Sequence, residues 1–211
     1  IALGVLTGTY VFSSGSNLVR DVVSNTIIDS ATIYFASREK LVSLNKNDGI
    51  MNWSYSLPED STSKSALIAQ DSTLILVNKG YAYWGNKLID FGEPFLLKIN
   101  KTTGEKIYYE SLNKKKIPIY ALKFETDSLK LLFTDELANY TLKDGLKGQS
   151  KMFNKDTYGT LSFFVGSQLY SKTTDSNPKY ATISDSINYY VQTSLGKTLK
   201  LDKNFNMISE F

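Results

Sequence analysis

Residues 41–55 read LVSLNKNDGIMNWSY, and this stretch decides the fold that we predict for the chain. A strand with one apolar side leads into a turn that ends at Gly49, and a second strand carries Trp53 four residues later. Alternation of apolar and polar residues is typical of half-buried β-strands, and glycine supplies the positive φ that a tight turn needs. The stretch therefore predicts a β-hairpin that buries one side.

The same hairpin pattern recurs along the chain. Its turn segments are residues 44–49, 99–104, 140–145 and 201–206. The last copy has Asn206 in the glycine place, and asparagine also tolerates positive φ. An Asp-Ser pair before an apolar run precedes each turn, at residues 29–30, 71–72, 127–128 and 185–186. Because the two landmarks keep their order in four copies, the sequence predicts four repeats of one unit.

Each repeat is expected to form four short strands. In the first repeat these strands lie near residues 25–28, 32–37, 40–44 and 50–55. Four strands in about 40–45 residues is typical of a β-propeller blade, which needs a neighbour on each face. The predicted fold class is therefore all-β: a β-propeller of four-stranded antiparallel blades, in one domain or a propeller fragment. The blades are expected near residues 25–57, 66–112, 120–153 and 180–211. A β-sandwich is the alternative, but it would not explain two ordered landmarks in four copies.

The hairpin of residues 41–55 resembles the blade signature of the PQQ-like (quinoprotein-type) β-propeller repeat. That signature is a strand ending in Leu-Asn or Leu-Asp, a turn ending in Gly, and a Trp four residues beyond. Residues 95–109 repeat it with Tyr108 in the Trp place, whereas the later copies have Gln149 and Glu210 there. The resemblance implies that Trp53 docks between the first two blades. It also implies a non-enzymatic binding or scaffold member, with a periplasmic or cell-surface location.

The first twenty residues are expected to end a preceding blade. Residues 7–12 read TGTYVF and match residues 103–108, TGEKIY, which supply the turn and fourth strand of the second repeat. The chain starts without an initiating Met or a secretory signal, which indicates a trimmed or excised polypeptide. Four blades and one stray strand would leave an open sheet edge. We therefore expect the native polypeptide to extend beyond Ile1.

Composition excludes several kinds of chemistry. The 211 residues contain no cysteine and no histidine, which excludes disulfides, thiolate nucleophiles, Cys/His zinc sites and a Ser-His-Asp triad. The net charge of +3 is too small to predict binding to nucleic acid. No apolar run approaches the 18 or more residues of a membrane span. The sequence predicts no cofactor, no metal and no transmembrane segment.

Carboxylates in the long loops define an alternative function. Propeller glycosidases or lyases would need two carboxylates at a fixed separation across a pocket. The candidates are Asp90, Glu93, Asp156 and Asp175, although exposed loop acids explain these residues equally well. A carbohydrate-binding or carbohydrate-active propeller is therefore the alternative to a non-catalytic scaffold for a protein partner.

Two long insertions carry the aromatic residues of the candidate binding site. Residues 78–94 are expected to join the second and third strands of blade two. Residues 154–179 are expected to link blades three and four, with an added hairpin turning at Gly166 and Ser167. Long loops on a rigid scaffold commonly carry function, and Tyr and Trp are favoured anchors. The site residues are Tyr81, Tyr83, Trp84, Phe91, Tyr158, Phe163, Phe164 and Tyr170. Packing of the loops against one another is the alternative role.

Overall fold

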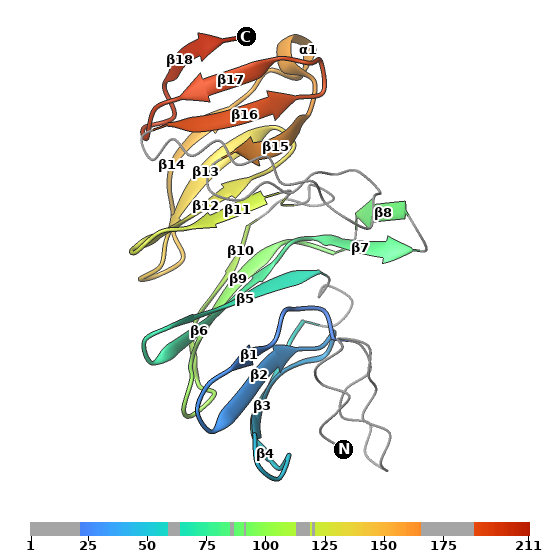
Figure 1. Ribbon diagram of the computed structural model, residues 1–211, viewed down its shortest axis with the longest axis vertical. Coiled ribbons are helices and arrows are strands. Elements are labelled where there is room, and N and C mark those ends of the chain that lie inside the picture. The colour runs from blue at the N-terminus through green and yellow to red at the C-terminus, as the bar shows by residue number, and fades with distance from the viewer. Residues whose placement is uncertain are drawn as a thin grey trace. The chain divides into compact units, whose positions relative to one another are not determined.

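The computed structural model describes residues 22–58, 64–84, 87–90, 92–112, 119, 121–165 and 188–211. Within these residues the chain forms four antiparallel sheets of four strands each, a two-stranded sheet and one short helix (Figure 1). The predicted fold class, all-β with propeller-type blades of four strands, is confirmed. The expected leading strand at residues 7–12 lies outside the described residues.

Blade one is a meander of four neighbouring strands. Its strands are β1 (Ile27–Ile28), β2 (Thr32–Ala36), β3 (Lys40–Asn45) and β4 (Met51–Ser56). They pair in chain order, so each turn joins two adjacent strands. The hairpin β3–β4 is the one that the sequence stretch 41–55 predicts.

Blade two has the same order with one insertion. Its strands are β5 (Ser65–Gln70), β6 (Thr73–Asn78), β9 (Phe95–Asn100) and β10 (Lys106–Ser111). Between β6 and β9 the chain makes a separate two-stranded sheet of β7 (Tyr81–Trp84) and β8 (Lys87–Asp90). The expected insertion between the second and third strands is therefore a β-hairpin.

Blades three and four complete the set. Blade three consists of β11 (Ala121–Phe124), β12 (Ser128–Leu132), β13 (Glu136–Thr141) and β14 (Lys147–Met152). The helix α1 (Lys155–Tyr158) follows it. Blade four consists of β15 (Leu161–Val165), β16 (Tyr189–Thr193), β17 (Thr198–Leu201) and β18 (Met207–Glu210).

Blade four corrects the expected position of the second insertion. Residues 161–165 do not form an added hairpin in the link between blades, because β15 pairs with β16 as the first strand of blade four. This strand lies well before the range near 180–211 that the repeat pattern suggests. The insertion is therefore residues 166–188, between the first two strands of the blade. The repeat pattern did not reveal this pairing, because residues 166–188 separate the two strands in sequence. The strands can still pair, because the entropic cost of closing a loop grows only slowly with its length.

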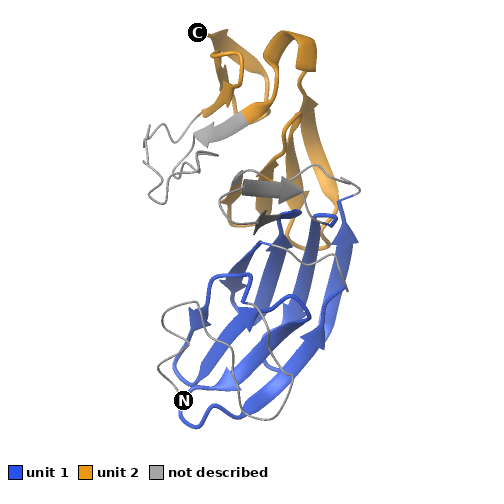
Figure 2. Ribbon diagram, turned by 90° about the vertical axis from the view of Figure 1, so that its right-hand side faces the viewer, with its two compact units in different colours: residues 1–84, 88–116 blue, residues 85–87, 117–211 orange. Residues whose placement is uncertain are grey.

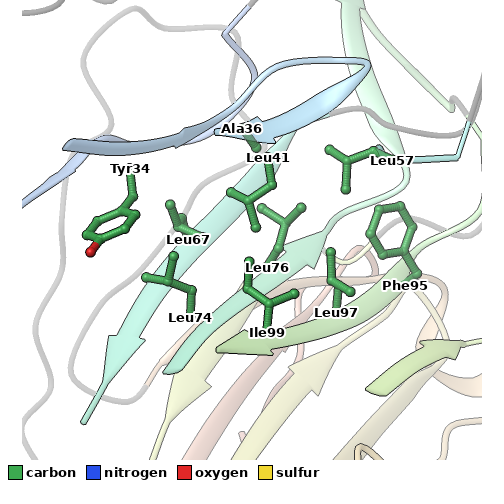
Figure 3. Packing of buried hydrophobic residues seen from close by; sticks show 10 residues of the cluster. All are labelled: Tyr34, Ala36, Leu41, Leu57, Leu67, Leu74, Leu76, Phe95, Leu97 and Ile99. Carbon is green, nitrogen blue, oxygen red and sulfur yellow. The ribbon is translucent and has the colours of Figure 1, made fainter. Parts of the chain in front are cut away.

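The chain divides into two compact units, coloured separately in Figure 2. Blades one and two lie in the first unit, and blades three and four in the second. In the first unit, alternate residues of the central strands of both blades form one apolar core together with Leu57, which follows β4, and Leu67 of β5 (Figure 3). Its members are Tyr34, Ala36, Leu41, Leu57, Leu67, Leu74, Leu76, Phe95, Leu97 and Ile99. The second unit has a core of the same kind, which includes Leu132, Leu137, Tyr189 and Phe205.

The turns between third and fourth strands follow the predicted chemistry in three blades. Gly49, Gly104 and Gly145 have φ values of 73°, 74° and 77°. Blade four differs, because its turn is one residue shorter and Phe205, not Asn206, takes the positive φ of 61°. A bulky residue with positive φ is uncommon and carries strain. The expectation that Asn206 replaces the glycine is therefore wrong.

Three Asp-Ser pairs lie at the junctions between first and second strands, but not at one register, and the pair at residues 185–186 lies outside the described residues. Asp29 follows β1, and its Oδ1 accepts hydrogen bonds from the backbone N–H groups of Ala31 and Thr32 at 3.3 and 3.0 Å. Asp71 lies within a two-residue turn and has φ 49°. By strand pairing, the residue equivalent to Asp29 in blade three is Glu125 rather than Asp127. The pair marks the turn, not a repeated site.

Trp53 docks between blades one and two, as expected. Its indole Nε1 donates to the backbone oxygen of Lys101, in the turn of blade two, at 3.1 Å. Gln149, which occupies the Trp place in blade three, donates likewise to the backbone oxygen of Asn204 in the turn of blade four. The shorter turn places Ser209 rather than Glu210 at this position in blade four, since Ser209 pairs with Lys200 as Trp53 pairs with Ser43. The docking hydrogen bond therefore survives without a tryptophan.

Candidate functional site: an anchored aromatic hairpin

The hairpin β7–β8 is an addition to blade two. In Figure 1, β7 carries the chain on beyond β6, and β8 brings it back toward the start of β9. The four strands of the blade pair with one another without it. The hairpin is therefore available for a role other than building the blade.

A buried asparagine fixes the base of this hairpin. Asn78, the last residue of β6, is fully buried, and its Nδ2 donates to the backbone oxygen of Glu93 at 2.8 Å. Its Oδ1 accepts from the hydroxyl of Ser65 at 3.4 Å. Since a buried amide is costly unless its hydrogen bonds are made, this side chain holds the two stems of the hairpin together.

Glycine and proline bring the two stems close. Gly80 has φ 71°, and a Cβ placed on it would lie 2.9 Å from Cδ of Pro94. A larger residue at this position would meet both the strain of positive φ and the proline ring. The sequence requires glycine here for the stems to approach.

Two lysines flank the same base. The Lys79 backbone N–H donates to the oxygen of Lys64, and the Lys64 N–H donates to the oxygen of Tyr81, both at 2.8 Å. Burial, with a smaller contribution from the charge of Lys64, lowers the pKa of Lys79 to about 8. Backbone hydrogen bonds therefore hold the base of the hairpin, and two lysine side chains lie beside it.

The aromatic residues of the predicted site fall into both units. Tyr81, Tyr83 and Trp84 lie on β7, whereas Phe91 and Tyr170 lie outside the described residues. Tyr158 ends α1 in the second unit, where its ring packs edge-on against Phe153 at 5.9 Å between centroids. Phe163 and Phe164 lie on β15, opposite Gln192 and Val191. Tyr158 is thus part of the packing of the second unit, and the described aromatic site residues of the first insertion all lie on β7.

The loop carboxylates occupy separate environments. Glu93 accepts a hydrogen bond from the Ser111 hydroxyl at 3.3 Å, in the first unit. Asp156 is exposed on α1, in the second unit, where its backbone N–H donates to Oδ1 of Asn154 at 2.7 Å. Asp90 ends β8, and Asp175 lies outside the described residues. Within the described ranges, no group of three or more acidic residues is placed to hold a metal ion.

One charged cluster was not predicted from the sequence. Glu125 lies 3.0 Å from Nζ of Lys130 and 3.5 Å from Nζ of Lys123, and it accepts from the hydroxyl of Tyr189 at 3.0 Å. Burial acts to raise the pKa of Glu125, but the bonds from Lys130 and Tyr189 and the two lysine charges lower it overall. Burial and the nearby carboxylate raise the pKa of Tyr189. The cluster joins blades three and four, and its only signal in the sequence is Lys130 at an inward position of β12.

Comparison with known proteins identifies the fold alone. No family model matches the chain, and no curated protein matches it. The structure is similar to that of the computationally designed Ika4 protein, with a TM-score of 0.50, 11% identity, and coverage of 90% of this chain and 99% of that one. A protein of unknown function from Bacteroides caccae matches with a TM-score of 0.46 and 13% identity, over 90% of this chain and 60% of that one. BamB from Moraxella catarrhalis matches with a TM-score of 0.31 and 11% identity, over 90% and 76%.

The sheets and the docking contacts define the class of this protein. It is an all-β protein of propeller-type blades, in which a side chain from the fourth strand of one blade bonds to a turn of the next. The likeness to the Ika4 protein extends over nearly the whole of that chain and supports the same fold. At this level of identity it does not extend to function.

Proposed function

We propose that this protein is a non-catalytic scaffold that binds a protein partner through the β7–β8 hairpin. The observation that carries the proposal is the buried Asn78, which fixes an aromatic hairpin that the blade itself does not need. Tyr and Trp are enriched among the residues that dominate binding energy at interfaces. A hairpin held in place before binding also avoids part of the entropic cost of ordering a loop.

Membership of the PQQ-like propeller superfamily is part of the proposal. The docking of Trp53 on the turn of blade two supports it, because the blade signature assigns the tryptophan to that contact. An extracytoplasmic location follows from the same resemblance. Among the described helices there is none of the length and hydrophobicity that a membrane span requires. Fractionation of the source cells with an antibody to this chain would test the location, and a purely cytoplasmic signal would contradict it.

A binding experiment tests the role of the hairpin. The chain is immobilised and exposed to an extract of the source cells, and the retained proteins are compared with those of Trp84→Ala. Loss of a hot-spot aromatic should weaken the specific partner by about 2 kcal/mol or more while the melting temperature stays nearly unchanged. Phe211→Ala is the matched control, because this residue is 72% exposed and lies outside the hairpin. Equal loss in both variants, or a partner that Trp84→Ala retains fully, would contradict the proposal.

The absence of catalysis is also open to test. A panel of glycans is incubated with the protein and analysed for cleavage products. Turnover that disappears in Glu93→Gln or Asp156→Asn would replace the scaffold proposal with the carbohydrate-active alternative. Turnover that persists in these variants and in Asp90→Asn and Asp175→Asn points to a contaminant and leaves the scaffold proposal in place.

A further inference from the structure

A blade that follows another within one unit has a receiving face, formed by four residues of its two central strands. In blade two these are Leu74 opposite Ile99 and Leu76 opposite Leu97. All four are fully buried, and they belong to the core that blade one shares. The receiving face is therefore the surface on which a blade accepts the blade before it.

Blade one has the same face at the same register. The pair Ile33 and Leu44 corresponds in register to Leu74 and Ile99 of blade two. The pair Phe35 and Val42 corresponds to Leu76 and Leu97. These residues point away from the core between blades one and two and form a cluster of their own. Phe35 and Val42 are only 1% and 2% exposed. Among the described residues, Val22 is the one apolar neighbour from outside the face, and it is too small to cover it.

We propose that residues 1–21 occupy the receiving face of blade one, in the manner of the last strand of a preceding blade. The described chain leads to this face, because Val22 bridges to Ser37 and the Val23 N–H donates to the oxygen of Ala36 at 2.9 Å. Residues 10–12 are Tyr-Val-Phe, and in sequence they follow a Thr-Gly pair as the fourth strand of blade two follows Thr103 and Gly104. The segment therefore has both the apolar side chains and the position that the face requires.

The opposite face of blade four does not offer an equivalent partner. Blade one packs Ala36 and Leu41 against blade two, and blade three packs Leu132 and Leu137 against blade four. All four residues are fully buried. Blade four has Gln192 and Thr198 at these positions, both half-exposed. Packing Gln192 against an apolar face would remove its amide from water, which is unfavourable unless the amide makes hydrogen bonds there. Blade four of a second copy is thus a poor occupant for the face of blade one.

The absence of cysteine allows a direct test in the full chain. A single thiol is introduced by Val42→Cys on the receiving face, or by Gln192→Cys on blade four as control, and its rate of modification by a maleimide is measured. A thiol covered by the segment reacts only when the segment opens, so Cys at 42 should react at least about tenfold more slowly than Cys at 192. Tyr10→Ser, Val11→Ser and Phe12→Ser together should raise the rate at 42 about tenfold and leave the rate at 192 unchanged.

Three results would overturn the proposal. Rapid modification at 42 in the chain with its natural segment would show that the face is open. Slow modification that persists in the triple serine variant would show that another part of the chain covers it. Protection that disappears on dilution would assign the face to a second copy.

A crosslink keeps the test decisive if the triple variant does not fold. Phe12→Cys is combined with Val42→Cys, or with Gln192→Cys as control, in the otherwise natural chain. Mild oxidation should form an intramolecular disulfide in the first pair much faster than in the second. Equal rates in the two pairs would overturn the proposal.

Discussion

The indole ring of Trp53 occupies the space that a side chain on Gly104 would need. A Cβ on Gly104 would lie 2.7 Å from Cδ2 of Trp53, so the large residue of blade one fits against the absent side chain of blade two. Blades three and four reverse the sizes at the same two positions. Gln149 takes the place of Trp53, and Phe205 takes the positive-φ place of Gly104 and packs into the shared core. The aromatic ring therefore belongs to the preceding blade in the first unit and to the following blade in the second unit, and both interfaces contain a docking hydrogen bond.

Trp53→Ala should destabilise the protein by about 3 kcal/mol. The change removes a large, partly buried ring from the core between blades one and two and also its hydrogen bond to Lys101. The free energy of unfolding from a denaturant melt checks this. A loss below about 1 kcal/mol would contradict the docking assignment, since it would mean that the ring contributes little.

Gly104→Ala should cost more than Gly49→Ala. Both residues have φ near +74°, so both variants place a Cβ in a left-handed conformation at a cost of about 1–2 kcal/mol. Gly49 has open space around it, whereas Gly104 meets the Trp53 ring. The difference between the two losses in unfolding free energy measures the contact. In a Trp53→Ala background this difference should vanish, and a difference that stays unchanged would rule out the ring as its cause.

Gln149→Trp should destabilise the protein unless Phe205 is also changed. The natural Gln149 faces a turn that already carries an aromatic side chain, so a second ring would overpack the interface by about 1–3 kcal/mol. Adding Phe205→Gly should recover part of this loss, because it restores the arrangement of Trp53 and Gly104 and removes the strain at φ 61°. Strictly additive losses in melts of the single and double variants would show that the two positions do not interact.

The cluster around Glu125 should make stability depend on pH in the acidic range. The folded pKa of Glu125 lies below its ordinary value of 4.5, so the carboxylate stabilises the fold above that value. The stabilisation should be lost as the pH falls through the folded pKa. Melts of the natural chain and of Glu125→Gln between pH 7 and about pH 2 test this. The variant should be less stable near neutrality and should show a shallower decline, and parallel curves would contradict the assignment.

Asn78→Ala should loosen the β7–β8 hairpin. Loss of the amide leaves the Glu93 oxygen and the Ser65 hydroxyl without this buried partner, at a cost of about 1–3 kcal/mol. Limited proteolysis should then cut within residues 81–90 before the blades are digested. Asn52→Ala is the control, because Asn52 is an exposed residue of β4 that donates to the Ser43 hydroxyl within blade one, outside the hairpin. An unchanged cleavage pattern in Asn78→Ala would show that the hairpin is held by other contacts.

Local pattern was sufficient to predict much of this protein. The turn at Gly49 and the strands on either side of it follow from residues close together in the chain, whereas the docking role of Trp53 was expected only from the resemblance to the PQQ-like repeat. Backbone conformation and strand alternation depend on neighbouring residues, so a single stretch of sequence specifies them. The repeat of that stretch then predicts the number of blades that the structure describes.

Tertiary structure alone decided the rest, because those features depend on pairings between distant residues. The strand β15 belongs to blade four because it pairs with β16 across residues 166–188, and no local signal marks that partner. Gln149 is a docking residue because it donates a hydrogen bond to the backbone oxygen of Asn204. Phe205 occupies the positive-φ position that glycine has in the other blades, because the turn of blade four is one residue shorter. The docking contact needs only a hydrogen-bond donor near the turn of the next blade, so either a tryptophan or a glutamine can make it. The sequence by itself therefore determined the four-stranded blade. Which side chains connect one blade to the next was decided by the tertiary structure.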